Sequence, residues 1–394
     1  AIIFFWKLIS IFKYDIAIIR VLEYNIMQVR TQNLQEVFME FMSAREAADK
    51  WGISQRRVAV LCSEQRIKEA TMVGNMWIMP SSAQKPIDAR SMRYNRTEEK
   101  TVKPFLKWAG GKGQLLNEIE YYYPFSSGKI TKYVEPFVGG GAVLFDILSK
   151  YDLDEIYISD INAELINTYR IIRDDIDALI QMLHTMQNDF IPLDTDNRKA
   201  YYMQKRERFN ALKINGDEDI NIEKAALMVF LNKTCFNGLF RVNKKGLFNV
   251  PMGSYKNPMI CDENNLRTVS KKLQKVTIVC GDYRESADFI DENTFVYFDP
   301  PYRPITDTAS FTAYTENSFN DDAQIELAQF VAEMDKKGAK IVISNSDPKN
   351  SDADDDFFDN IYSAHKIKRV EATRMINCNS EARGRIKELL ISNF

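Results

Sequence analysis

The chain has 394 residues, and its composition is that of a folded globular protein. Hydrophobic residues make up 45% and charged residues 27%, with 16 Gly and 12 Pro, which excludes a chain that is disordered throughout or built from collagen-like repeats. At roughly 150 residues per domain, this length predicts two or three domains. The 52 Lys and Arg against 55 Asp and Glu give a net charge of -3, so any contact with nucleic acid needs a locally basic surface.

Cysteine and histidine are too few and too scattered to predict a metal centre. The five Cys are odd in number and form no C-x-x-C pair, which argues against a disulfide framework and a thiolate zinc site. The two histidines, His184 and His365, are most simply surface residues, so His-ligated metal chemistry and a Ser-His-Asp triad are poorly supplied. We therefore expect no metal, and chemistry that rests on carboxylates, backbone dipoles and aromatic faces.

Residues 1–40 are expected to be a poorly defined extension. Residues 1–27 are rich in Ile and Phe but are interrupted by charged residues, so they do not reach the ~18 apolar residues that a membrane-spanning helix needs. No signal-peptide pattern is evident. We expect a mis-set start or a poorly ordered segment, with an amphipathic helix that packs on the next domain as the alternative. We expect no membrane contact and a cytoplasmic protein.

Residues 41–80 predict a small domain that opens with two short helices. Ser43 is a good N-cap for the first helix, and Glu46 completes a capping box. Gly52 ends that helix, and Ser54 can cap the second. Two short helices across a tight turn with a glycine are typical of a helix-turn-helix.

The second of these helices begins with Arg56 and Arg57, at the end that would enter a DNA major groove. Residues 69–80 then predict a hairpin with a Gly-Asn tip, which would form a wing. This stretch resembles the small DNA-binding helix-turn-helix of excisionase and MerR-like proteins, which implies docking to DNA or to a protein. The alternative is a purely structural helical hairpin, which would show the same caps.

Residues 81–102 are predicted to be a polar linker, because they show no apolar periodicity. Between Lys85 and Lys112 there are eight Lys or Arg and three acidic residues, so the entry to the following domain is locally basic. A solvated surface is the plainest interpretation of such a run.

From residue 103 to residue 394, short β-rich runs alternate with helical patterns. The runs cover residues 132–137, 155–160, 276–282, 294–300 and 340–347. The alternation predicts an α/β fold with a mainly parallel sheet that is covered on both faces, and a site outside the carboxyl ends of its strands. Residues 185–260 interrupt the alternation and predict an inserted helical subdomain that ends in a basic loop.

Two motifs at the ends of these runs suggest a site for an adenosine-bearing ligand. The motif Glu-Pro-Phe-Val-Gly-Gly-Gly at 135–141 ends a strand and opens a helix, where glycines let a ligand approach free backbone N–H groups. A carboxylate at the end of the next strand can accept both hydroxyls of a ribose, and one at the end of the strand after it could lie near an adenine ring. Helix capping is the alternative for both carboxylates. The candidate cofactor contacts are Glu135, Phe137, Gly139, Gly141, Asp160 and Asp282.

The third motif, Asp299-Pro300-Pro301-Tyr302, follows the apolar run TFVYF directly. Two prolines forbid continuation of the strand and fix the main chain. Asp299 then offers a carboxylate, Pro300 a carbonyl oxygen and Tyr302 a flat ring, and together these match an amino group on a planar ring. A chance turn with the same letters is the alternative.

These motifs, with FLKWAGGK at 105–112, stand in the order found in the Dam-type DNA adenine-N6 methyltransferases (D12 class, alpha group), which the chain resembles over about residues 103–394. The resemblance extends to 236–251, 310–314, 343–347 and the C-terminal tail. It implies an S-adenosylmethionine-dependent, Rossmann-like methyltransferase fold that methylates adenine N6 in duplex DNA, commonly in GATC. It also implies cofactor contacts at Trp108, Lys112, Asp160 and Asp299, and DNA contacts at Lys107, Asn237, Leu239 and Arg241.

The stretch from Leu231 to Lys256 points to nucleic acid on its own composition as well. It contains no acid and five basic residues, Lys233, Arg241, Lys244, Lys245 and Lys256, with Phe236, Phe240 and Phe248 interleaved with asparagines. Arg and Asn can bind base edges, and Lys can neutralise phosphates. Aromatic side chains can fill the gap that an extruded base leaves. A solvated basic loop over an aromatic cluster is the alternative.

In the mechanism that these motifs predict, the target adenine turns out of the duplex and stacks on Tyr302. Asp299 and the Pro300 carbonyl accept its two amino hydrogens. One alternative is a DNA-binding regulator with a degenerate methyltransferase domain, but such a regulator does not need an intact DPPY motif. The other is an NAD-linked oxidoreductase, which needs a diphosphate loop that is not apparent. Cytosine-N4, RNA and protein-amide substrates stay open, and so does a cognate restriction endonuclease as a partner.

Overall fold

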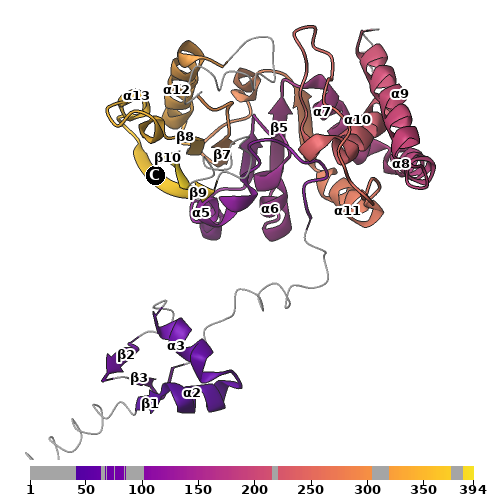
Figure 1. The fold of residues 1–394 in the computed structure, drawn as a ribbon. Helices are drawn as coiled ribbons and strands as arrows, with labels where there is room; N and C mark the ends of the chain where they lie inside the picture. Colours follow the sequence, from indigo (N-terminus) through magenta and orange to yellow (C-terminus); the bar gives the residue numbers. More distant parts are fainter. Residues whose placement is uncertain are drawn as a thin grey trace, which may run out of the picture. The chain divides into compact units, whose positions relative to one another are not determined.

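The structure is a computed structural model that describes residues 41–63, 67, 69–74, 76–83, 85, 102–214, 221–303, 319–373 and 385–394. The chain divides into two compact units, Ala1–Glu99 and Lys100–Phe394 (Figure 1). The expected extension 1–40, residues 86–101 of the linker and the 310–314 motif lie outside the described residues. None of the described helices is both long and apolar enough to span a bilayer.

The described part of the first unit contains two helices and a small sheet. β1 (Phe41–Ser43), β3 (Met76–Pro80) and β2 (Thr71–Val73) form an antiparallel sheet in this order, and α2 (Ala44–Trp51) and α3 (Gln55–Ser63) lie between β1 and β2 in the chain. The two predicted helices and the predicted hairpin are thus present. The sequence did not predict β1, because a strand of three residues carries too little alternation to be recognised.

Local capping and a separate core hold the first unit together. Ser43 N donates to Glu46 Oε2 at 2.7 Å and Glu46 N donates to Ser43 Oγ at 3.3 Å, which is the predicted capping box. Gly52 ends α2 with a φ of +63°. The buried residues form a cluster within this unit: Met42, Ala44, Ala47, Ala48, Val58, Leu61, Cys62, Ile67 and Met79. The first unit therefore has a hydrophobic core of its own.

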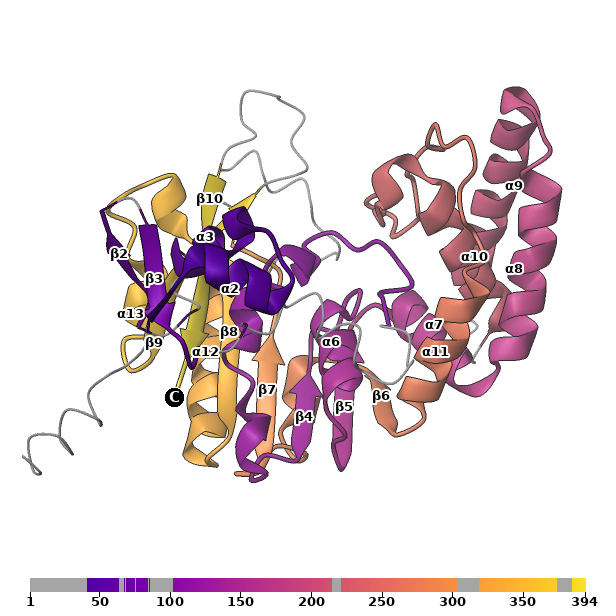
Figure 2. The same ribbon diagram turned by 90° about the horizontal axis from the view of Figure 1, so that it is seen from below.

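A seven-stranded sheet forms the centre of the second unit. Its strands are β4 (Lys132–Glu135), β5 (Glu155–Asp160), β6 (Val276–Cys280), β7 (Thr294–Phe298), β8 (Lys340–Ser346), β9 (Lys366–Thr373) and β10 (Arg385–Ser392). They lie in the order β6-β5-β4-β7-β8-β10-β9, with β4 to β8 parallel and β10 antiparallel to both of its neighbours. The chain order reverses between β4 and β7, which lie side by side in Figure 2, and this is the switch point at which open α/β sheets bind ligands.

Both faces of this sheet are buried, as the continuous apolar runs predict. Along β7, Phe295 and Tyr297 join one hydrophobic cluster, whereas Val296 and Phe298 join another on the opposite face. The first cluster includes side chains of α5 (Leu116–Glu120), α6 (Ala142–Lys150) and α7 (Ala163–Asp174). The second includes side chains of α12 (Asp321–Lys336) and α13 (Phe357–Ile361). The predicted α/β architecture, a Rossmann-like and mainly parallel sheet with helices on both faces, is confirmed.

In the described part of the chain, five helices stand between β5 and β6, and the last four extend the first cluster beyond the sheet. After α7 come α8 (Ile176–Phe190), α9 (Thr195–Ile214), α10 (Ile222–Thr234) and α11 (Glu263–Leu273). Between α7 and α8 the chain leaves helical geometry at Asp175, whose φ of -143° and ψ of 56° are not helical. The loop between α10 and α11 carries a 3₁₀ turn, η3 (Phe236–Gly238), and two bridges, Cys235 to Met252 and Val242 to Phe248.

Short 3₁₀ turns complete the second unit: η1 (Lys112–Gln114), η2 (Pro124–Ser127), η4 (Tyr283–Ser286) and η6 (Pro348–Asn350).

The expectation that both histidines are surface residues is wrong for one of them. The side chain of His184 is 43% exposed, whereas that of His365 is 6% exposed and packs edge-on against Tyr362. The basic residues that surround His365 in the sequence suggested an exposed position, but the turn before β9 folds this side chain inward.

Candidate active site

The DPPY motif forms a corner directly after the buried strand β7, at the switch point of the sheet. Asp299 Oδ1 lies 2.7 Å from Lys112 Nζ, and the Lys112 side chain is only 5% exposed. Lys112 Nζ also donates to the Gly110 carbonyl at 2.6 Å. Burial raises the pKa of Asp299, and the Lys112 ammonium opposes that shift. Two residues that the sequence assigned to a cofactor site, Lys112 and Asp299, are thus in direct contact.

Tyr302 is held at both ends of its side chain. Its ring centroid lies 4.5 Å from Lys112 Nζ, a cation–π distance. Its hydroxyl donates to Glu388 Oε2 on β10 at 2.7 Å. Burial raises the pKa of Tyr302 well above its ordinary value, so the phenol stays neutral and keeps its proton for this bond. Sequence reasoning missed Glu388, because the pairing that places β10 beside β8 links distant parts of the chain.

Buried side-chain amides hold the main chain of the corner in place. Gln324 Nε2 donates to the Pro301 carbonyl at 3.0 Å, and Asn345 Nδ2 donates to Gln324 Oε1 at 3.1 Å. Both amide side chains are fully or almost fully buried. Among the described residues no group donates to the carbonyl of Pro300, which belongs to a buried residue. A buried carbonyl of this kind is available to a donor from a ligand.

The glycine turn after β4 is shaped by the indole of Trp108. A Cβ atom at Gly139 would lie 2.9 Å from Trp108 Cδ1, so only glycine lets the indole lie against this backbone. The Trp108 ring stacks on Phe240 with centroids 5.4 Å apart and planes 20° apart. Phe137, at the start of the turn, packs against Tyr283 at 5.5 Å. The turn therefore joins the sheet edge to the loop between α10 and α11.

Replacing Gly141 with alanine is expected to destabilise the protein by about 1–3 kcal/mol. Gly141 has a φ of +70°, and a Cβ atom there would lie 2.5 Å from the Tyr169 hydroxyl oxygen. Thermal unfolding checks this prediction, with Gly113→Ala as the matched control, because a Cβ atom at Gly113 meets nothing within 4 Å. Equal unfolding midpoints for the two variants would contradict it.

Asp160 lies at the end of β5 and binds the glycine turn. Its Oδ2 accepts from Gly139 N at 3.1 Å and its Oδ1 from Asn162 N at 2.9 Å. Asn162, not Asp160, caps α7, since Asn162 Oδ1 accepts from Leu165 N at 2.9 Å. Burial raises the pKa of Asp160 and the backbone donors lower it. The carboxylate is thus positioned beside the turn and is not used as the helix cap.

The other two acids of the predicted set have different surroundings. Glu135 is 2% exposed and accepts from the Tyr133 hydroxyl at 2.8 Å, and burial raises its pKa well above the ordinary value. Asp282 caps η4: its Oδ1 accepts from Arg284 N at 3.0 Å, and Glu285 Oε1 accepts from Asp282 N at 3.1 Å. The structure thus gives Asp282 the capping contacts that the sequence left as its alternative.

The predicted DNA-contact residues lie in two adjoining segments. Asn232, buried on α10, binds both segments: its Oδ1 accepts from Lys107 N at 2.9 Å, and its Nδ2 donates to the carbonyls of Lys107 at 2.8 Å and Gly238 at 2.9 Å. Sequence reasoning missed Asn232, which carries no signal of its own within a helical pattern. These hydrogen bonds from Asn232 place Lys107, Asn237 and Leu239 next to one another.

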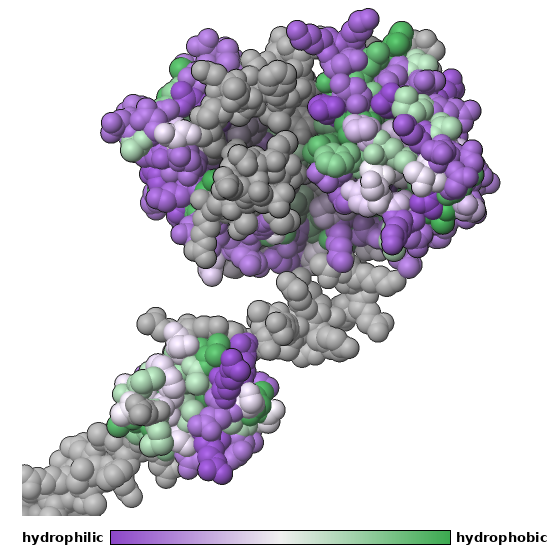
Figure 3. Space-filling model, in the orientation of Figure 1, coloured by the Kyte–Doolittle hydropathy of each residue, from purple (hydrophilic) through white to green (hydrophobic). Residues whose placement is uncertain are grey.

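The rest of the loop presents charge outward and aromatic rings inward. The side chains of Arg241, Lys244 and Lys245 are exposed, and Arg241 Nε donates to Asn249 Oδ1 at 2.9 Å. Of the three phenylalanines, Phe240 and Phe248 are 4% and 2% exposed, whereas Phe236 is 51% exposed. The prediction that aromatic side chains of this loop can fill the gap left by an extruded base therefore rests on Phe236, because the other two rings belong to the hydrophobic core. Hydrophilic side chains cover much of the neighbouring face of the second unit (Figure 3).

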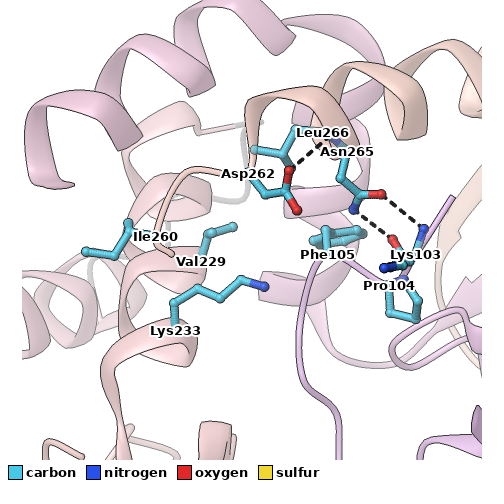
Figure 4. Close-up of a pocket in the computed structure, with 9 residues that line it drawn as sticks. All are labelled: Lys103, Pro104, Phe105, Val229, Lys233, Ile260, Asp262, Asn265 and Leu266. Atoms are coloured by element: carbon cyan, nitrogen blue, oxygen red, sulfur yellow. Dashed lines mark hydrogen bonds between the residues drawn. The ribbon is translucent and has the colours of Figure 1, made fainter. Parts of the chain in front are cut away.

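A cavity of about 200 Å³ lies apart from the DPPY corner, between the chain that enters the second unit, α10 and α11 (Figure 4). Asn265 holds that entering chain, since its Oδ1 accepts from Lys103 N at 3.0 Å and its Nδ2 donates to the Lys103 carbonyl at 2.9 Å. Lys233 and Asp262 face the cavity, and burial lowers the pKa of Lys233. These contacts set the path of the segment that leads to Lys107 and Trp108.

Comparison with known proteins agrees with this geometry. Residues 108–376 match the family model described as D12 class N6 adenine-specific DNA methyltransferase. The type II methyltransferase M.MjaIII of Methanocaldococcus jannaschii is 51% identical over 296 residues, which is 74% of this chain and 99% of that protein. The type II methyltransferase M1.LlaDCHI of Lactococcus lactis is 36% identical over 295 residues, which is 74% of this chain and 96% of that protein. The DNA adenine methylase of Escherichia coli is 35% identical over 291 residues, which is 74% of this chain and 95% of that protein. The chain therefore belongs to the D12 class of N6 adenine-specific DNA methyltransferases.

Proposed function

We propose that this protein moves the methyl group of S-adenosylmethionine to adenine N6 in duplex DNA at one short site, GATC, and that it does so in the cytoplasm. The observation that carries the proposal is the Asp299 corner, where three groups come together at the switch point of the sheet: a partly open carboxylate, the Pro300 carbonyl, which has no donor among the described residues, and a fixed phenol ring. The GATC site rests on the resemblance of the loop around Asn237, Leu239 and Arg241.

The residues at the sheet edge fit S-adenosylmethionine, which supplies an electrophilic methyl group when bound. Asp160, at the end of β5, offers a half-buried carboxylate to the ribose hydroxyls. Phe137 and Trp108 provide apolar and aromatic walls beside the glycine turn. The carboxylate of Asp299 suits the positive charge of the ligand, and Glu135, Lys112, Gly139 and Gly141 complete the proposed contacts. Asp282 is a weaker member of this set, because its carboxylate is occupied in a cap.

For the target base, the residues of the corner supply position and hydrogen-bond acceptors. The adenine stacks on Tyr302, whose ring is held by Lys112 and Glu388. Asp299 and the Pro300 carbonyl accept the two hydrogens of the amino group, which turns the nitrogen lone pair out of the plane of the base. Pro301 keeps the corner rigid, since its carbonyl is bound by Gln324. Positioning and preorganised acceptors account for the acceleration.

The loop between α10 and α11 is proposed to recognise the DNA. Phe236 is the exposed ring that can fill the space left by the extruded adenine. Arg241, Asn237 and Leu239 contact bases, while Lys107, Lys244 and Lys245 neutralise phosphates. Asn232 joins these contacts to the segment that carries Trp108, so DNA and cofactor contacts share one support.

Sequencing of single DNA molecules from a methylation-free host that expresses this chain tests the proposal. We expect N6-methyladenine in one short context, GATC, in both strands. Another modified base, or no modification, would contradict the proposal. If no modification is found, tritium transfer from labelled cofactor to duplex DNA in vitro distinguishes an inactive regulator from an enzyme that is poorly expressed.

We also propose that the first unit docks on DNA through the start of α3. Arg56 is exposed and Arg57 half-buried there, one turn after Gly52. The full chain with Arg56→Ala and Arg57→Ala should bind long duplexes more weakly. The slope of log affinity against log salt concentration should become shallower by about two. Arg45→Ala, an exposed arginine on α2, is the matched control, and equal effects for both changes would contradict a specific role of α3.

A further inference from the structure

The two oxygens of the Asp299 carboxylate have different surroundings. Oδ1 accepts from Lys112 Nζ at 2.7 Å and from Ser344 Oγ at 3.1 Å. Oδ2 has no hydrogen bond to any of the described residues. The Asp299 side chain is 21% exposed, which leaves an open side on an otherwise enclosed carboxylate. One oxygen is therefore anchored twice, and the other is available to a ligand.

The contact from Ser344 has a fixed direction. Ser344 Oγ lies 2.8 Å from the Tyr297 hydroxyl, and both side chains are fully buried. A serine hydroxyl has one hydrogen to donate, and ionised Asp299 can only accept. The Ser344 hydrogen therefore goes to Asp299, and Tyr297 donates to Ser344. Burial raises the pKa of Tyr297 well above its ordinary value, so this phenol keeps the proton that it donates.

The strands that carry these hydroxyls make the contact rigid. Tyr297 lies on β7 and Ser344 on β8, and the two strands pair in parallel with Phe298 opposite Ile343. Lys112 supplies charge, and an ammonium is a point charge with no preferred direction, so Lys112 alone does not fix the rotation of the carboxylate. A hydroxyl held by a sheet does fix it, because the terminal torsion of an aspartate is otherwise broad.

We propose that Ser344, supported by Tyr297, is a positioning residue that fixes the Asp299 carboxylate through Oδ1 and directs Oδ2 to the amino group of the target adenine. This inference rests on the proposed function and deepens it, since it assigns the accepting oxygen. It also gives a role to the ISNSD motif at 343–347, for which the sequence supplied a resemblance and no chemistry.

Ser344→Ala should lower the single-turnover rate of methyl transfer about 10- to 100-fold, the effect of losing one hydrogen bond to a charged group. The affinities for S-adenosylmethionine and DNA should stay within about twofold of the wild type, because the Ser344 side chain is fully buried. Ser344→Thr, which keeps a hydroxyl, should recover most of the rate. Tyr297→Phe leaves the Ser344 bond in place and should lower the rate less than Ser344→Ala.

The pH dependence distinguishes positioning from a general loss of structure. The hydrogen bond from Ser344 lowers the pKa of Asp299, so removing the Ser344 hydroxyl raises that pKa. The acid limb of the pH–rate profile should then move to higher pH. Among the described residues, the charged or titratable groups that interact with Asp299 are Lys112, Glu135, Tyr297 and Tyr302. Ser346→Ala is the matched control: Ser346 is also buried on β8, but its hydroxyl donates to the Arg303 carbonyl at 3.0 Å, so the acid limb should stay in place.

The outcomes separate this inference from the proposed function. If the wild-type protein transfers no methyl group to adenine, the proposed function fails and Ser344 has no reaction to serve. If the wild type is active and Ser344→Ala is folded, with an unchanged rate and acid limb, the inference fails alone. If Ser344→Ala does not fold, Tyr297→Phe decides: a folded Tyr297→Phe that transfers methyl groups at the rate of the wild type would overturn the inference.

Discussion

Asp299→Ala is expected to abolish methyl transfer, with a fall in kcat of about 10³-fold or more. The change removes an acceptor for the adenine amino group and the charge that stabilises the positive nitrogen as it forms. It also leaves Lys112 without the carboxylate at 2.7 Å, and breaking a buried pair of this kind costs about 3–5 kcal/mol. Cofactor binding should survive in part, because Asp160 and the glycine turn are unchanged.

Two further variants separate chemistry from stability in this experiment. Asp299→Asn keeps the shape of the side chain and one acceptor oxygen, so it should retain measurable transfer at a rate well below that of the wild type. Asp347→Ala is the matched control: it removes a fully buried carboxylate from the same edge of the sheet, 3.0 Å from Arg369 Nε, and should lower stability without abolishing transfer. Near-wild-type turnover by Asp299→Ala would exclude the proposed role.

The sequence predicted the sheet edge well because buried parallel strands are continuous apolar runs that end abruptly. TFVYF before Asp299 and EIYISD ending at Asp160 both have this form, and each candidate acid follows the last buried residue of its strand. Since parallel strands bring their carboxyl ends to one edge, the order of the motifs predicted which side chains would meet.

The residues that support this edge were beyond reach of the sequence. Gln324 lies in an amphipathic helix and Asn232 in a buried one, and neither differs from a neighbouring polar residue until the fold places a backbone carbonyl beside it. β9 and β10 were missed as strands because their pairing is antiparallel and long-range, and β9 is a charged edge strand. The buried positions of Phe240 and Phe248 depend on the same tertiary contacts, so aromatic content alone overestimated the exposed rings.

Arg241→Ala is expected to relax sequence choice more than it lowers general DNA affinity. Arg241 Nε is bound to Asn249 Oδ1, so the guanidinium is oriented while its two terminal nitrogens have no partner among the described residues. That arrangement suits a bidentate contact with guanine, which is worth about 1–3 kcal/mol of discrimination. The preference at one base pair of the site should therefore fall by about 5- to 150-fold, as measured by kcat/KM on duplexes that differ at a single base pair.

Lys245→Ala is the matched control, because this side chain is also exposed on the same loop but offers only a point charge. It should weaken binding to all duplexes alike and leave the sequence preference unchanged. The slope of log affinity against log salt concentration should become shallower by about one. The two variants together assign base reading and phosphate contact to different residues of one loop. If Arg241→Ala behaved like Lys245→Ala, with an unchanged preference at every position, Arg241 would be a phosphate contact, and recognition would have to lie with Asn237 and Leu239.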